Sequence, residues 1–412
     1  MSNPFSALKT KDFRTYWIGM AVSTIGTWMQ NIAQPWLAYK LTDSALLISL
    51  IGALQYLPML LLALVAGVYV DRVSKKKILL FTQSASLVIV LVLALLVSTG
   101  KIQYWHLLVA ATALGCVNTL DMPARQALLS ELVPKEELMD AIALNSAVFN
   151  MARTIGPAVA GIVMEVWGIG VCFYVNAFSF AAVVVSLLFI HPHSNVQPAG
   201  EMPKLPDMKR DIREGLRYIK ENKILLLTLM GLFTLGTFAL NFSVLIPVFS
   251  KTVLSQQETG YGFLMSCMGI GSFVGAMLVA AQSKKKPSKL VLYGLPVLSG
   301  LSLIALGLTR TYALTCVAIA FAGYFIIRYT ATANSTLQTN SDPEHLGRVM
   351  SAYTLVFAGT TPIGNLFTGF IAQKFGAPAA FLACGGVILA LLVPINLYRV
   401  RLGRAGLAEG EH

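Results

Sequence analysis

Apolar segments of about twenty residues recur along the whole chain, and they constrain its fold more than any other feature. Each is long enough to cross the hydrocarbon core of a bilayer as a helix. They lie near residues 14–39, 46–71, 77–99, 104–130, 140–166 and 169–190, and again near 224–251, 259–281, 288–309, 312–340, 347–374 and 378–402. We therefore expect an all-α polytopic membrane protein with twelve transmembrane helices. We expect kinks at Pro123, Pro157, Pro247 and Pro362, because proline removes a backbone donor.

The composition agrees with a lipid environment and argues against several other classes of protein. Apolar residues make up 56% of the chain and charged residues only 12%. The five cysteines and five histidines are scattered, so no disulfide framework, metal site or catalytic cluster is indicated, and an enzyme is not expected. The sequence also lacks a Walker phosphate loop, so we expect no cofactor and no direct use of ATP.

Basic residues indicate how the chain is oriented in the membrane. The net charge is +12, and five basic residues fall in the loops that would lie outside if the N-terminus is cytoplasmic, namely Lys40, Lys101, Lys251, Arg310 and Lys374. Most of the others fall in inner segments, seven of them in the central linker. The positive-inside rule then places both termini and the linker in the cytoplasm. Because this accounts for the charge, no nucleic-acid partner is expected.

The chain divides into two six-helix halves joined by a polar linker. We expect an N-terminal bundle at 1–190, a cytoplasmic linker at 191–223 and a C-terminal bundle at 224–412. Ile212, Leu216 and Ile219 recur at helical spacing in the linker, which indicates an amphipathic helix, either on the anionic membrane surface or simply solvated. The halves also resemble each other, because SELVPKEELMDAIAL and TNSDPEHLGRVMSAY each place an acidic, proline-containing turn before a span with Gly, Pro and Thr.

The strongest local motif is GVYVDRVSKKK at 67–77, between the second and third spans. Gly67 lets another helix approach closely, and Asp71 at a membrane boundary requires a compensating partner. Arg72 and the lysines suit an anionic inner leaflet. An ordinary basic loop explains the lysines, but not the glycine and acid four residues apart.

This motif resembles the signature loop of the major facilitator superfamily, Gly-x-x-x-Asp-Arg-x-Gly followed by basic residues. Ser74 stands in place of the second glycine. The resemblance implies two pseudo-symmetric six-helix bundles and alternating access. It also implies that Gly67, Asp71 and Arg72 lock a cytoplasmic gate. A second, degenerate copy at Gly275 lacks the Asp-Arg pair, so the gate role is carried to the first copy alone.

Three further segments resemble the superfamily branch that holds enterobactin-type siderophore exporters and related macrolide and multidrug exporters. They are AQPWLAYKLTDSALLISLIGALQYLP, DMPARQALLSELVPKEELMDAIALNSAVFNMARTIGPAVAG and DIREGLRYIKENK. Gly156 and Pro157 resemble a shortened exporter-type Gly-Pro gating motif. The resemblance implies a monomeric transporter of the bacterial inner membrane that exports a siderophore-like or drug-like small organic solute by proton antiport. A lipid or lysolipid flippase, or an importer of the same fold, stays open as an alternative.

Polar side chains inside the spans are the candidate binding residues, because lipid would not tolerate them cheaply. Each either contacts substrate or hydrogen-bonds to a neighbouring helix. In the first span Thr27 shares one helical face with Gln30, Asn31 and Gln34. The candidates are Gln30, Asn31, Gln34, Asn118, Asn150, Arg153, Asn241, Arg328 and Asn334.

Charges within the spans carry the most information, since each costs about 2.5–3.5 kcal/mol or more at the bilayer centre. Asp121 is the candidate proton-coupling residue, with Glu131 and Glu165 behind it, although Asp121 can pair with Arg125 one turn on. Arg153 and Arg328 have no acid on their own helices. They either make the cavity positive, which would favour an anionic or polyphenolic solute, or pair with Asp121 across the bundle.

Overall fold

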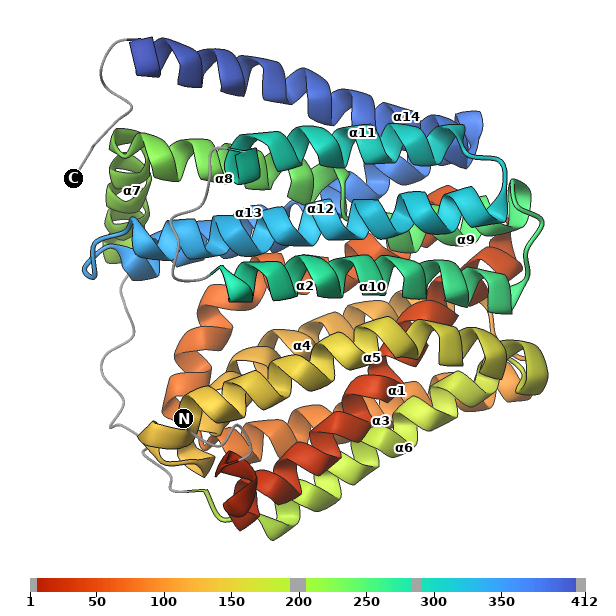
Figure 1. Ribbon diagram of the computed structural model, residues 1–412. Helices are drawn as coiled ribbons and strands as arrows, with labels where there is room; N and C mark the ends of the chain where they lie inside the picture. The colour runs from red at the N-terminus through yellow and green to blue at the C-terminus, as the bar shows by residue number, and fades with distance from the viewer. Residues whose placement is uncertain (1–5, 193–204, 283–289, 405–412) are drawn as a thin grey trace. The chain divides into compact units, whose positions relative to one another are not determined.

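The computed structural model describes residues 6–192, 205–282 and 290–404, and all regular structure within these ranges is helical (Figure 1). Short helical turns at Ser6–Lys9, Lys135–Glu137 and Leu290–Gly294 accompany the main helices. The main helices are α1 (Lys11–Thr42), α2 (Ala45–Arg72), α3 (Lys75–Ser98), α4 (Tyr104–Leu132), α5 (Leu138–Trp167), α6 (Ile169–Phe189), α7 (Leu205–Glu221), α8 (Lys223–Phe238), α9 (Phe242–Thr252), α10 (Glu258–Ala281), α11 (Leu295–Leu308), α12 (Tyr312–Thr339), α13 (Leu346–Gly359) and α14 (Thr361–Arg404).

The helices confirm the expected polytopic class. Within the described residues, ten segments are long and apolar enough to cross a membrane, and the last of them runs from Leu346 to Tyr398. That 53-residue segment holds two spans, because Gly376 takes a positive φ of 85° where two helices meet. Helix α1 is less apolar than these ten segments, but its 32 residues span more than a bilayer core. The described chain therefore supplies twelve spans.

Two of the spans are interrupted at positions where the sequence predicted no break. The seventh span breaks at residues 239–241, between α8 and α9, and the eleventh breaks at Thr360, between α13 and α14. By contrast, α4, α5 and α9 run without interruption through Pro123, Pro157 and Pro247. Pro362 is the second residue of α14, where its missing N–H costs no helical hydrogen bond.

The chain forms two compact units with matching helix contacts. The first comprises Met1–Glu201 with Ser255–Ser266, and the second comprises Met202–Leu254 with Cys267–His412. In the first unit α1 lies against α5 and α6, and α3 lies against α4 and α6. In the second unit α8 lies against α13 and α14, and α11 lies against α12 and α14. Since α8, α11, α12, α13 and α14 occupy the order of α1, α3, α4, α5 and α6, each unit repeats one packing scheme.

Glycines bring equivalent helices into backbone contact in both units. A Cβ atom on Gly115 of α4 would overlap the carbonyl oxygen of Gln55 in α2, and one on Gly271 of α10 would overlap that of Ala320 in α12. Helices α2 and α4 are the second and fourth spans of the first half, and α10 and α12 are the second and fourth spans of the other. Close approach of this kind allows helices to associate in lipid, where apolar burial alone provides little driving force.

The linker contains the expected helix, α7, which stands crosswise at one end of α8 and α13 (Figure 1). The Tyr218 hydroxyl donates to Asp342 Oδ2 at 3.0 Å, and the Tyr218 ring stacks on His345 with 4.1 Å between ring centroids. Glu214 pairs with Arg348 at 3.1 Å, and Ile219 is buried. Leu216 is exposed, so α7 docks on the second unit through one face and leaves another uncovered.

We expect Gly271→Val to lower the free energy of unfolding by about 1–3 kcal/mol, because an added side chain must separate α10 from α12. Thermal unfolding of the purified protein, followed by size-exclusion chromatography, measures the loss. Gly386→Val is the matched control, since a Cβ on Gly386 meets nothing within 4 Å among the described atoms. Equal melting points for the two variants would contradict the close packing of α10 on α12.

Candidate functional site

Asp121 is the centre of a buried hydrogen-bonded cluster in the first unit. Its Oδ1 atom accepts from the Thr82 hydroxyl at 2.7 Å and from Gln83 Nε2 at 2.6 Å, both on α3. Its Oδ2 atom accepts from Arg125 Nε, and Arg125 Nη1 lies 3.1 Å from the sulfur of Met20 on α1. Asp121 is only 2% exposed. The Asp121–Arg125 pair that the spacing allowed is thus present, and α3 supplies two further donors.

The glutamines of α1 hydrogen-bond to each other and to α6. Gln30 Nε2 donates to Gln34 Oε1 at 3.2 Å, and Gln30 Oε1 accepts from Asn176 Nδ2 at 2.6 Å. The Thr27 hydroxyl donates to Asn176 Oδ1 at 3.4 Å. Gln30, Gln34 and Asn176 are buried, whereas Asn31 is exposed on the same helix. Of the two roles considered for this stripe, these contacts favour helix packing for Gln30 and Gln34 and leave Asn31 accessible.

Arg153 sits in an aromatic setting with an incomplete set of partners. Its Nη2 atom donates to Asn150 Oδ1 at 2.9 Å, and its guanidinium lies 5.9 Å from the ring centre of Phe149. Phe149 in turn meets Trp28 of α1 edge-on. Arg153 Nε is buried without a hydrogen-bond partner, and no carboxylate in the described chain lies within 4 Å of this guanidinium. Arg153 therefore does not pair with Asp121.

The other candidate residue of the first unit's spans, Asn118, is exposed on α4.

In the second unit, Arg328 Nη1 donates to the Tyr324 hydroxyl one turn away, and Nη2 lies 3.4 Å from Gln282 Oε1. Asn334 is half-buried and accepts from Gln338 at 2.6 Å. Arg328, like Arg153, has no carboxylate partner among the described residues.

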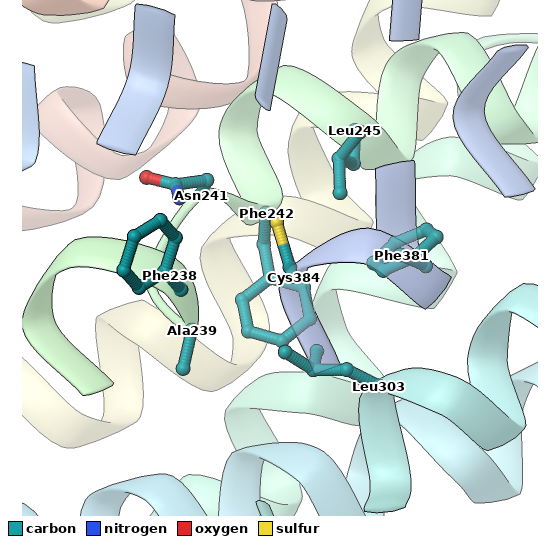
Figure 2. Close-up of a pocket in the computed structure, with 8 residues that line it drawn as sticks. All are labelled: Phe238, Ala239, Asn241, Phe242, Leu245, Leu303, Phe381 and Cys384. Carbon is teal, nitrogen blue, oxygen red and sulfur yellow. The ribbon is translucent and has the colours of Figure 1, made fainter. Parts of the chain in front are cut away.

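Asn241 lies at the break of the seventh span. Its Nδ2 atom donates to the Thr237 carbonyl at 2.8 Å and to the Thr368 hydroxyl at 3.0 Å, while its Oδ1 atom is buried without a partner. Figure 2 shows Asn241 beside a hollow that is lined otherwise by Phe238, Ala239, Phe242, Leu245, Leu303, Phe381 and Cys384. The hollow is too narrow for a water molecule. It is a packing gap at the helix break and has no room for a substrate.

The predicted gating loop turns tightly between α2 and α3. Gly67 lies in α2, and a Cβ there would meet nothing within 4 Å among the described atoms, so the structure does not show the expected close approach. Asp71 and Arg72 form the last turn of α2. Lys75 was expected at the anionic leaflet, but it is buried, 3.9 Å from Glu131 Oε1. Lys76 donates to the Ile190 carbonyl at 2.8 Å. Two of the basic residues thus hold the first unit together.

The Gly-Pro segment of α5 packs closely on two other helices of the first unit. A Cβ on Gly156 would lie 2.9 Å from Trp28 Cβ of α1, and one on Gly161 would lie 2.8 Å from the Glu258 carbonyl oxygen in the first turn of α10. The Pro157 carbonyl faces Gly262 of α10. Next to this contact of α5 with α10, Lys40 of α1 and Glu258 of α10 form an ion pair at 2.7 Å.

Sequence reasoning missed two of these partners, Asn176 and Glu258. Asn176 sits in an otherwise apolar span, and its lone amide gave no periodic signal. Glu258 follows a short polar loop, so the sequence presented it as a solvated loop-edge residue. Only the distances of 2.6 Å to Gln30 and 2.7 Å to Lys40 reveal their roles.

Comparison with known proteins places this architecture in a class. The crystal structure of a bacterial homologue of the human lysosomal transporter Spinster, inward-facing and unoccupied, superposes with a TM-score of 0.72 over 96% of each chain at 13% identity. At that identity the likeness concerns the fold alone. The fold is the one that major facilitator superfamily transporters have.

The sequence comparisons are narrower. The family described as transmembrane secretion effector matches residues 2–409, and the chain belongs to that family. It is 23% identical to the staphyloferrin A transporter of Staphylococcus aureus over 88% of this chain and 89% of that protein. It is 22% identical to macrolide efflux protein A of Streptococcus pyogenes over 92% and 94%. The chain is therefore a multi-pass membrane transporter related to efflux and secretion proteins, and not an enzyme.

We expect Asp121→Asn to lower the free energy of unfolding by about 3–5 kcal/mol, because it leaves Arg125 charged and without its carboxylate. Adding Arg125→Gln should restore part of the loss. Thermal unfolding of the wild type, both single variants and the double variant gives the coupling between the two residues. Additive losses would show that the ion pair does not stabilise the fold.

Proposed function

We propose that this protein is a secondary active transporter that exports a small organic solute, siderophore-like or drug-like, by alternating access coupled to protons. The family and the two relatives named above support export of compounds of this kind. We further propose that the protein lies in the bacterial inner membrane with both termini and α7 in the cytoplasm, as the distribution of basic residues favours.

The observation that carries the solute class is the incomplete pairing of Arg153. A guanidinium offers five N–H donors, and here Nη2 donates to Asn150 Oδ1 while Nε is buried without a partner. A carboxylate, hydroxamate or phenolate oxygen would satisfy the remaining donors with charge-assisted hydrogen bonds. The solute is therefore an anion or an acidic polyphenol.

Aromatic rings beside Arg153 suit the rest of such a solute. Phe149 lies under the guanidinium and meets Trp28 edge-on, and Phe149 is exposed. An aromatic or conjugated solute can stack on this surface while its anionic group pairs with Arg153. Asn150 fixes the guanidinium plane, and Asn31 and Asn118 remain exposed as further polar contacts.

Arg328 is a second cation of the same kind in the other unit. Tyr324 and Gln282, both neutral, are its hydrogen-bond partners among the described residues. Asn334 lies farther along α12. Each arginine, taken by itself, disfavours a cationic solute beside it, because like charges repel strongly where the dielectric is low.

We expect Arg153→Ala to reduce efflux of an anionic siderophore roughly tenfold or more, as the loss of one charge-assisted hydrogen bond implies. Efflux is measured in a host that lacks its own exporters, with and without a protonophore, across anionic and cationic compounds. Arg153→Lys should retain part of the activity because it keeps the charge. Arg310→Ala, an exposed arginine whose guanidinium contacts the carbonyls of Gly307 and Thr309, is the matched control and should transport as the wild type does.

Efflux of cationic drugs that survives Arg153→Ala would contradict the anionic solute class. Uptake of solute in place of efflux would show that the protein is an importer. Redistribution of a labelled lysolipid between leaflets, with no efflux of any compound, would show that it is a flippase.

A further inference from the structure

Glu258 and Lys40 form an ion pair at one end of the first unit. Glu258 is the first residue of α10, Lys40 lies in the last turn of α1, and Lys40 Nζ is 2.7 Å from Glu258 Oε1. The carboxylate side chain is 9% exposed, whereas the lysine side chain is 51% exposed. The pair therefore joins a buried acid to a cation that has ready access to water.

The surroundings of the pair are apolar and closely packed. Trp36 of α1 stacks on Tyr261 of α10 with 5.2 Å between ring centroids, and both residues are less than 2% exposed. On the α5 side, Gly161 and Gly262 bring the backbones together. Among the described residues, the charged or titratable groups at this crossing include Lys40 from α1 and Tyr261 from α10 itself. Glu165 from α5 is a third, and its carboxylate accepts from Thr259 N at 3.2 Å.

Glu258 differs from the carboxylates that the sequence suggested for proton coupling. Asp121 is held by an arginine, which stays charged at any physiological pH, and by two neutral donors. Glu165 is exposed, and Glu131 pairs with the buried Lys75. Glu258 is buried and its cation can withdraw into solvent, so the cost of losing its proton depends on where Lys40 lies.

Resting on the proton-coupled export proposed above, we propose that Glu258 is the carboxylate whose protonation releases α10 from α1 and opens this end of the transport pathway. A proton from water bonds to a carboxylate oxygen of Glu258 and makes the group neutral. Lys40 keeps its own proton and turns into solvent. Loss of the Glu258 proton to water restores the ion pair, and no other bond forms or breaks.

The sign of the pH dependence follows from this step. The ion pair requires ionised Glu258, so the closed arrangement is favoured above the pKa of Glu258 and lost as the pH falls through it. On the basis of the positive-inside orientation this end faces outward, because it contains Lys40 and the loop that follows α9. Acid on the outer side would then promote opening and solute release.

The test uses the full-length chain with its five cysteines replaced and a single reporter, Met265→Cys. Met265 is buried on the α10 face that carries Glu258 and Tyr261, at a spacing of seven and four residues. In lipid nanodiscs a water-soluble maleimide reaches both membrane faces, so the assay does not depend on transport direction. Because maleimide reacts with the thiolate, each rate is divided by that of free glutathione at the same pH. The normalised rate should be low at pH 8 and rise as the pH falls.

Glu258→Gln should raise the normalised labelling rate at pH 8 by about fivefold or more, the lower end of typical coupling between two states, and abolish the pH dependence of that normalised rate. Lys40→Gln should shift the acceleration to higher pH, because the buried carboxylate then ionises less readily. Glu165→Gln is the matched control: this exposed acid lies at the same crossing and its amide oxygen still accepts from Thr259 N, so the wild-type pH profile should persist.

A Glu258→Gln profile that still rises with acid would overturn the inference, as would loss of the profile in Glu165→Gln alone. Wild-type efflux in cells separates this failure from that of the proposed function. If efflux is protonophore-sensitive but the Glu258→Gln profile matches that of the wild type, the export proposal holds and the role of Glu258 is refuted. If the pH profile depends on Glu258 but no solute is exported, the role of Glu258 holds and the export proposal is refuted.

Discussion

The requirement that every buried polar group find a partner inside the protein governs this structure, because the hydrocarbon core offers none. Asp121 satisfies it with donors from two helices, and Arg125 extends the cluster to Met20 on α1. The cluster thereby connects α1, α3 and α4 in the first unit. A charge that would be costly alone becomes a specific contact between helices, and it fixes which faces of those helices meet.

The same requirement divides the candidate site residues into two kinds. Gln30 and Asp121 are hydrogen-bonded by neighbouring helices, and Gln34 by Gln30 on its own helix, which is what structural polar residues in a membrane do. Arg153 keeps an unmet donor beside exposed aromatic surface. A transporter must bind its solute without a permanent internal competitor, so the second kind of residue is the better candidate for contact with cargo.

The number and limits of the spans were predictable because bilayer thickness fixes the length of an apolar helix. The first span was expected at 14–39 and is Lys11–Thr42, and the tenth was expected at 312–340 and is Tyr312–Thr339. The repeat could also be detected, through the acidic proline turns before α5 and α13. The break at 239–241 was not predictable, since no glycine or proline stands there and tertiary contacts of Asn241 with Thr368 accompany it.

The polar face of α1 has a consequence for how the protein is made. Gln30 and Gln34 make α1 less apolar than the other spans of the first unit. Its partner Asn176 lies 146 residues later along the chain, on α6. During synthesis the hydrogen bond between Gln30 and Asn176 can form only after α6 has emerged. The polar contact between α1 and α6 thus waits until α2, α3, α4 and α5 have been made, and the first unit is complete only when Ser255–Ser266 has followed.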